Sequence, residues 1–141
     1  MRRILFGLFV IGSGLTLCGC GRSDSLYSVR GKIRYRGEPA VGALITFVPQ
    51  DTFRRTREPM AQAVVSEDGS FELAGPSGPG ARPGEYVVLV EWKEGAGKTR
   101  GRSPALNAPD RLKKKYLNPD KPLLKATIEA KSNDLPPFEI E

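Results

Sequence analysis

The chain has 141 residues, with 22 Lys and Arg against 16 Asp and Glu, two Cys and no His. This length suits a single domain. Without His there is no imidazole general base, no Ser-His-Asp triad and no His-ligated zinc, which excludes the enzymes that use these groups. We therefore expect a non-catalytic protein without a cofactor.

The N-terminal segment has the layout of an export signal. Arg2 and Arg3 give it a short positive start, and residues 4–17 form an apolar run that is followed by small residues. This run is shorter than the roughly 20 residues that a helix needs to span a bilayer. A transmembrane anchor is therefore the weaker interpretation, and we expect the protein to be exported.

Both cysteines lie at the end of this run, in the segment Leu17-Cys18-Gly19-Cys20. The segment resembles the bacterial lipobox, in which a Leu three positions before a Cys and a small residue just before it direct a diacylglycerol to the thiol. The resemblance implies that residues 1–19 are a lipoprotein signal peptide and that Cys20 is lipidated. An ordinary cleaved signal that releases a soluble protein, or an uncleaved anchor, are the alternatives.

A lipid on Cys20 makes the mature protein a membrane-anchored lipoprotein of the bacterial cell envelope, facing the periplasm or the outer surface. Residues 20–25 are then a polar tether, and residues 26–141 are the folded domain. Cleavage removes Arg2 and Arg3, which leaves 20 basic residues (22 minus 2) against 16 acidic ones. This modest excess predicts no nucleic-acid partner.

The first half of the domain has the alternation of β-strands. Polar and apolar residues alternate over residues 27–36, which predicts a strand with one face on a core. Residues 43–48 are rich in β-branched and aromatic side chains and predict a second strand. Residues 50–59 are polar and are expected to form a loop.

A hairpin is predicted next. Apolar segments at 60–65 and 71–73 flank Asp68-Gly69, and Asp-Gly between two such segments is a strong hairpin signal. Residues 75–84 are rich in Gly and Pro and are expected to be a loop.

The second half of the domain contains the most apolar predicted strand, at 86–92, which is expected to be central and covered on both faces. Residues 93–122 form a long irregular insertion, in which 109–116 is a candidate short helix with Asp110 as its N-cap. Further alternating segments at 124–130 and 138–140 bring the predicted strands to seven. This pattern predicts an all-β, seven-stranded antiparallel two-sheet sandwich.

Four segments resemble a known family when they are taken in order. They are Val-Arg-Gly-Lys-Ile-Arg-Tyr-Arg-Gly-Glu-Pro at 29–39, Phe-Val-Pro at 47–49, Glu-Asp-Gly-Ser-Phe at 67–71 and Pro-Gly-Glu-Tyr-Val-Val at 83–88. Together they are similar to the carboxypeptidase regulatory-like (transthyretin-like or prealbumin-like) domain. With Asn-Asp-Leu-Pro-Pro-Phe at 133–138, they resemble the small lipoproteins of planctomycete-type bacteria that carry one such domain. The resemblance implies a structural or binding module of exported proteins.

The insertion carries the candidate contact for an anionic partner. Its basic residues are Lys98, Arg100, Arg102, Arg111, Lys113, Lys114 and Lys115. Such a cluster attracts polyanions or anionic lipids, although a solvated loop is the competing interpretation. The basic residues of the first strand are interpreted as a solvated face that hinders edge-to-edge association. They are Arg30, Lys32, Arg34 and Arg36.

The alternative function is recognition of an anionic glycan or carbohydrate by this insertion together with an exposed aromatic residue. Trp92, Tyr86 and Tyr116 are the candidate stacking residues, although Trp92 on an apolar strand suits a core position better. No metal site is predicted, because the loop carboxylates lack calcium-loop spacing. The expected partners are the membrane, through the lipid, and an envelope protein or anionic glycan; the oligomeric state stays open.

Overall fold

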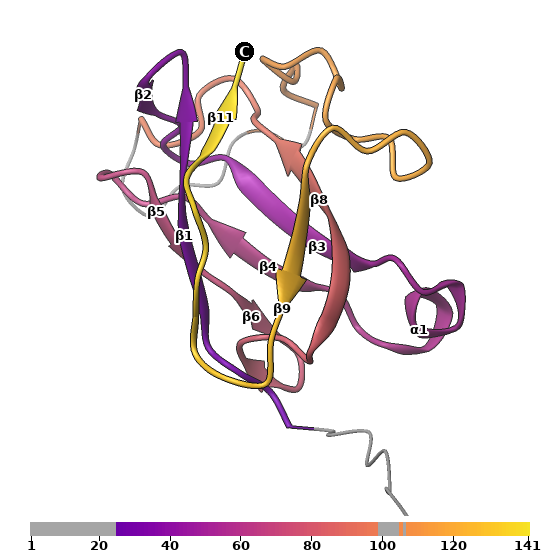
Figure 1. Ribbon diagram of the computed structural model, residues 1–141. Helices are drawn as coiled ribbons and strands as arrows, with labels where there is room; N and C mark the ends of the chain where they lie inside the picture. Colours follow the sequence, from indigo (N-terminus) through magenta and orange to yellow (C-terminus); the bar gives the residue numbers. More distant parts are fainter. Residues whose placement is uncertain (1–24, 99–104, 106) are drawn as a thin grey trace, which may run out of the picture.

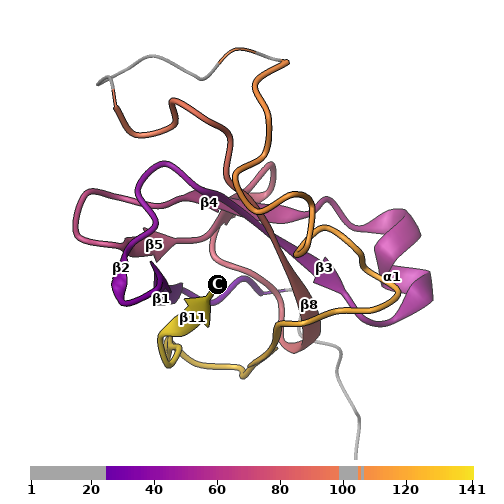
Figure 2. The ribbon, with the colours of Figure 1, turned by 90° about the horizontal axis from the view of Figure 1, so that it is seen from above.

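Two β-sheets face each other in the computed structural model, which describes residues 25–98, 105 and 107–141. The larger sheet has the strand order β7-β6-β4-β3-β8-β9, and β1 is the centre of the smaller one. Figure 2 shows the two layers, with β3, β4 and β8 in one and β1, β2, β5 and β11 in the other. The strands of the larger sheet are β3 (Leu44–Pro49), β4 (Ala61–Val64), β6 (Ala74–Gly75), β7 (Gly78–Pro79), β8 (Gly84–Glu91) and β9 (Lys125–Ile128). Those of the smaller sheet are β1 (Val29–Tyr35), β2 (Glu38–Pro39), β5 (Ser70–Glu72), β10 (Asn133–Asp134) and β11 (Phe138–Ile140).

The core lies between the two sheets. Alternate residues of β1 point into it, and Val29 and Ile33 are fully buried. The ring of Phe47 on β3 lies 6.3 Å from that of Phe71 on β5, so aromatic contacts connect the two sheets. These contacts explain why period-two alternation was a reliable guide: each strand has one face against the opposite sheet.

All seven predicted strands are present, and β8 is buried on both faces at its start, as predicted. Tyr86, Val87 and Val88 are each at most 3% exposed. The additional strands β2, β6, β7 and β10 have two residues each, which is too short for an alternating pattern to reveal. Together these findings support an all-β sandwich.

The expected purely antiparallel pairing is wrong for the smaller sheet. Strand β1 pairs in parallel with β10 and with β11, while its pairing with β2 and β5 is antiparallel. The chain leaves the larger sheet after β9 and returns beside β1 in the same direction (Figure 1). An alternating pattern indicates a strand but not the direction in which it pairs, so the sequence did not predict the parallel pairing of β10 and β11 with β1.

The predicted hairpin around Asp68-Gly69 is also wrong, although its turn forms. Asp68 Oδ1 accepts hydrogen bonds from the Ser70 amide at 3.0 Å and the Ser70 hydroxyl at 2.6 Å. The flanking strands belong to different sheets, because β4 pairs with β3 and β5 pairs with β1. The turn therefore carries the chain from one layer of the sandwich to the other.

A helix replaces the loop expected at residues 50–59. Helix α1 (Thr52–Arg57) begins at Asp51, whose carboxylate accepts from the amides of Phe53 at 2.8 Å and Arg54 at 3.4 Å. It contains no buried residue, so it has no apolar stripe by which a sequence pattern reveals a helix. Within the described ranges, no helix is long and apolar enough to cross a membrane.

The short helix expected at 109–116 does not form. Arg111 to Tyr116 make consecutive turns, and Lys113 and Lys114 have left-handed φ values of 50° and 62°, which interrupt a right-handed helix. Asp110 nevertheless accepts backbone hydrogen bonds, from the amide of Leu112 at 3.3 Å and that of Lys114 at 2.7 Å. Leu112 and Tyr116 are buried by these turns without helical geometry.

Candidate functional site

The predicted basic contact residues separate into two groups. Lys98 and Arg111 line one cleft, whereas Lys113, Lys114 and Lys115 do not line it. Instead, Lys115 pairs with the Glu141 carboxylate at 3.8 Å. Arg100 and Arg102 lie outside the described residues, as do Cys20 and the signal segment.

The cleft has a volume of about 500 Å³ and lies at the end of β1 and β8. We call it the arginine–tryptophan cleft. The lining residues that matter for its chemistry are Tyr35, Arg36, Glu38, Val41, Trp92, Lys98 and Arg111. The first strand was expected to show all its basic residues on a solvated face, but Arg36 lies beyond the strand end, with a φ of 52°. That turn brings Arg36 to the cleft, which therefore holds three cations and one carboxylate.

Trp92 is the fixed centre of the cleft. Its indole Nε1 donates to the Val41 carbonyl at 2.9 Å, and its backbone amide donates to Asp110 Oδ1 at 2.8 Å. The guanidinium carbon of Arg111 lies 3.5 Å from the centre of the Trp92 ring, a close cation–π contact. Because the Arg111 amide also donates to the Trp92 carbonyl at 2.7 Å, both backbone and side chain of Arg111 are held in place.

A second arginine–aromatic pair adjoins the first. The rings of Tyr35 and Trp92 meet edge to face, with centres 5.5 Å apart. The guanidinium of Arg36 lies 5.2 Å from the centre of the Tyr35 ring. Two guanidinium groups thus lie over two aromatic rings that contact each other.

A comparison of the chain with protein-family models, with curated proteins and with solved structures finds no match. The site is therefore interpreted from its own chemistry.

Two glycines hold the loop that carries Lys98 against the rest of the cleft. A Cβ on Gly42 (φ 80°) would lie 2.4 Å from the Gly97 amide nitrogen, and a Cβ on Gly97 (φ 75°) would lie 2.7 Å from the Val41 carbonyl oxygen. Real Cβ atoms do not approach backbone this closely, so both positions need glycine. This contact between backbones fixes one wall of the cleft.

Replacing Gly42 by Ala is expected to lower the free energy of unfolding by about 2–4 kcal/mol, since it adds a backbone clash to an unfavourable positive φ. Gly37→Ala is the matched control, because its φ is also positive, at 86°, but no atom lies within 4 Å of the added Cβ. The control is expected to cost about 1 kcal/mol. Denaturant unfolding monitored by circular dichroism measures both, and equal losses would contradict the backbone contact.

The three candidate stacking aromatics are all buried. Trp92, Tyr86 and Tyr116 are 5%, 3% and 6% exposed. The face of Trp92 is in addition covered by Arg111. None of these three rings offers an open platform to a sugar.

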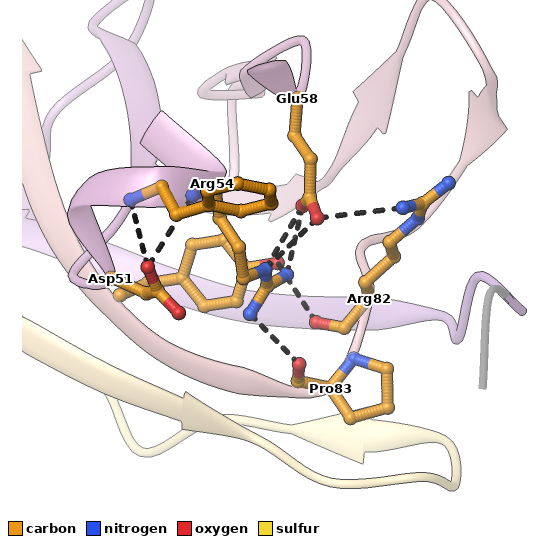
Figure 3. Close-up of polar contacts among 7 residues, drawn as sticks. Asp51, Arg54, Glu58, Arg82 and Pro83 are labelled. Carbon is orange, nitrogen blue, oxygen red and sulfur yellow. Dashed lines mark hydrogen bonds and ion pairs between the residues drawn. The ribbon is translucent and has the colours of Figure 1, made fainter. Parts of the chain in front are cut away.

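A second polar cluster, which sequence reasoning missed, fastens α1 to β8 (Figure 3). The Arg54 guanidinium binds both oxygens of Glu58, with contacts of 3.0–3.1 Å. It also donates to the Pro83 carbonyl at 3.0 Å and to the Tyr86 hydroxyl at 2.9 Å. Tyr86 in turn donates to the Arg82 carbonyl at 2.8 Å, so its hydroxyl group both accepts and donates a hydrogen bond within the cluster.

The cluster has the properties of a structural clamp. Its hydrogen bonds to Glu58 raise the pKa of Arg54 above the usual value, so this guanidinium stays charged. Burial raises the pKa of the Tyr86 hydroxyl, which stays protonated at neutral pH and is no nucleophile. Asp51, the N-cap before α1, was the local signal that would have revealed this segment.

Replacing Arg54 by Met is expected to lower the free energy of unfolding by about 1.5–3 kcal/mol, less than the 3–5 kcal/mol of a fully buried pair. The Arg54 and Glu58 side chains retain 13% and 20% exposure, and Arg82, which contacts Glu58 at 3.4 Å, remains as a partner for this carboxylate when Arg54 is replaced. Arg57→Met, on the same helix but exposed, is the control and is expected to change the stability by less than about 0.5 kcal/mol. Thermal unfolding of both variants is the measurement, and equal melting temperatures would contradict the clamp.

Among the described residues, no group of three or more His, Cys, Asp or Glu side chains is arranged to hold a metal ion. Three of the loop carboxylates have backbone or ion-pair partners: Asp51 caps α1, Glu58 binds Arg54 and Asp68 stabilises its turn. The arginine–tryptophan cleft is therefore the best candidate for a functional site in the described part of the chain.

Proposed function

We propose that the protein is a non-catalytic, lipid-anchored module of the bacterial cell envelope with a structural or binding role. The observation that carries this proposal is the order of the chain: a lipobox-like segment ending at Cys20 precedes the folded sandwich by only a few polar residues. A tether of this length keeps the sandwich close to the membrane surface. Both the proposed export and the proposed lipid anchor depend on this N-terminal segment.

The position of the cleft relative to the anchored end supports a role in display. The described chain starts beside β7, where Tyr27 bridges to Ala81, and β1 then runs away from this point (Figure 1). Tyr35 and Arg36, which line the cleft, lie at the other end of β1. At about 3.3 Å per residue, this strand separates the two ends by roughly 20 Å. The module thus presents its cleft away from the membrane that holds it.

We also propose that the sandwich is a carboxypeptidase regulatory-like, transthyretin-like domain. The motif glycines agree with this assignment, because Gly37, Gly42, Gly69 and Gly84 all have positive φ values that suit glycine at turns. The seven predicted strands agree with it as well. The mixed direction of pairing around β1 is the feature that a determined structure of a family member must share.

Fractionation of cells that produce the full chain tests the proposed function. The protein is expected in the membrane fraction after washes at high salt and high pH, and in the soluble fraction only after detergent. Affinity purification from that detergent extract, followed by mass spectrometry, then identifies envelope partners. Recovery in the salt wash would show attachment by charge alone and would contradict the lipid anchor.

Recognition of an anionic glycan is the second candidate function. One observation favours it: Arg36, from the end of the first strand, joins Lys98 and Arg111 of the insertion in a single cleft. The charge of the insertion is thus organised around a concave surface that a ligand can enter.

A further inference from the structure

We propose that the arginine–tryptophan cleft binds the carboxylate groups of an acidic polysaccharide of the polyuronate class. This inference rests on the second candidate function above and names its ligand chemistry. It is carried by three properties of the cleft: its net positive charge, the position of two guanidinium groups over aromatic rings, and the burial of the Trp92 ring.

The cleft carries a net positive charge among its described residues, because Glu38 is the one carboxylate beside Arg36, Lys98 and Arg111. No carboxylate in the described part of the chain forms an ion pair with Arg36, Lys98 or Arg111. Other arginines are paired: Arg30 with Glu72, Arg34 with Glu139 and Arg54 with Glu58. The cleft is therefore a place where an anion gains attraction without displacing an internal partner.

The two guanidinium groups are prearranged for carboxylates. The central guanidinium carbon of Arg111 lies 3.5 Å from the centre of the Trp92 ring, and that of Arg36 lies 5.2 Å from the centre of the Tyr35 ring. Stacking occupies one face of a guanidinium but leaves the N–H groups along its edges available. Such an edge binds a carboxylate with two parallel hydrogen bonds. Because the close contact with Trp92 restricts the Arg111 side chain beforehand, its binding to a carboxylate costs less conformational entropy.

A polysaccharide suits the cleft better than an acidic peptide or a membrane. Peptides gain affinity from apolar pockets or from pairing with a strand edge, but arginines cover the Trp92 and Tyr35 rings. Apart from Lys98, the remaining lining residues are Glu38, Pro39, Val41, Ala96 and Gly97, none of which carries a large aromatic side chain. An anionic membrane is disfavoured because the cleft lies at the end of β1 opposite the start of the described chain. A chain of uronic acids supplies both carboxylates and hydroxyls.

Titration of the full chain in non-ionic detergent micelles with oligogalacturonate tests this assignment. Trp92 is the single tryptophan of the protein, so its fluorescence reports directly on the cleft. We expect saturable binding with a change in this fluorescence, and no binding of neutral dextran. Calorimetry then gives the affinity of each variant, and the loss of one charge-assisted bidentate contact is expected to weaken binding about tenfold for Arg111→Ala and for Arg36→Ala.

Lys114→Ala is the matched control, since it removes the same charge from the same insertion but outside the cleft. It is expected to change the affinity by less than about twofold. Arg111→Lys keeps the charge but loses the planar edge, and is expected to weaken binding several-fold. If Arg111→Ala does not fold, Arg36→Ala carries the test, because Arg36 lies in an exposed turn.

Several results would overturn the assignment. Absence of binding to oligogalacturonate would contradict the assignment. Equal losses of affinity for Lys114→Ala and Arg111→Ala would show a general attraction of polyanions. Tighter binding to polyglutamate or to phosphatidylglycerol vesicles would show a peptide or a membrane as the partner. The full chain with Cys20→Ala is expected to bind oligogalacturonate normally, so failure of the anchor and failure of the cleft are separate results.

Discussion

Replacing Cys20 by Ala is expected to abolish the incorporation of a clickable fatty acid into the protein, whereas Cys18→Ala is expected to leave it unchanged. The two cysteines are two positions apart, but only Cys20 is preceded by a small residue, Gly19, with Leu17 three positions before it. Cys18 directly follows the bulky Leu17 and is a poor acceptor. In-gel fluorescence after labelling of growing cells measures the difference.

The expected effect is large because the proposed lipid anchor depends on a single thiol, that of Cys20. A diacylglycerol supplies two acyl chains, and at about 0.8 kcal/mol for each buried methylene group two chains hold a protein firmly in a bilayer. Without the lipid, the basic residues of the domain contribute only an electrostatic attraction to the membrane, which salt screens. Equal labelling of the two variants, or labelling that is lost in Cys18→Ala alone, would contradict the assignment of Cys20.

Replacing Phe47 by Ala is expected to lower the free energy of unfolding by about 3–5 kcal/mol. Phe47 is fully buried on β3. The centre of its ring lies 6.3 Å from that of Phe71 and 5.9 Å from that of Tyr86. The change leaves a cavity between the two sheets, where neighbouring strands are fixed by pairing and cannot close it. Such a loss is a large part of the roughly 5–15 kcal/mol that stabilises a typical domain.

Val64→Ala is the control for this substitution. Val64 lies on the neighbouring strand β4 but is 62% exposed, so its loss is expected to change the stability by less than about 0.5 kcal/mol. Equilibrium unfolding in urea, followed by the fluorescence of Trp92, compares the two variants. A loss below 1 kcal/mol for Phe47→Ala would place this ring outside the core and would contradict the layering of the sandwich.

The positions of the strands were predictable because each strand has one face on a core. Residues such as Val29 and Ile33 are buried at alternating positions, and this alternation is a local property of the sequence. The partners of the strands were not predictable in the same way. Asp68 and Gly69 specify a tight turn, but the turn does not determine that the strand after it joins the opposite sheet.

Helix α1 shows a second limit of sequence patterns. It has six residues and none of them is buried, so it is held by its ends and by Arg54 rather than by an apolar face. The ion pair of Arg54 with Glu58 and its bond to Tyr86 join residues up to 32 positions apart. A long-range polar contact of this kind leaves no periodic signal.

The candidate site was predicted in part. Charge alone pointed to Lys98 and Arg111 in the insertion, and both line the arginine–tryptophan cleft. Arg36 was assigned to a solvated strand face, because alternation was continued one residue beyond the end of β1, where the backbone turns left-handed. The stacking of Arg111 on Trp92 depends on the turns that follow Asp110, and their conformation differs from the helix that the sequence favoured.

The proposal that this is a lipid-anchored envelope module is tested most directly by mass spectrometry of the N-terminal peptide of the protein purified from membranes. We expect a peptide that begins at Cys20 and carries the added mass of a diacylglycerol on that residue. A peptide that begins before Cys20, or one that begins at Cys20 without added mass, would contradict the account.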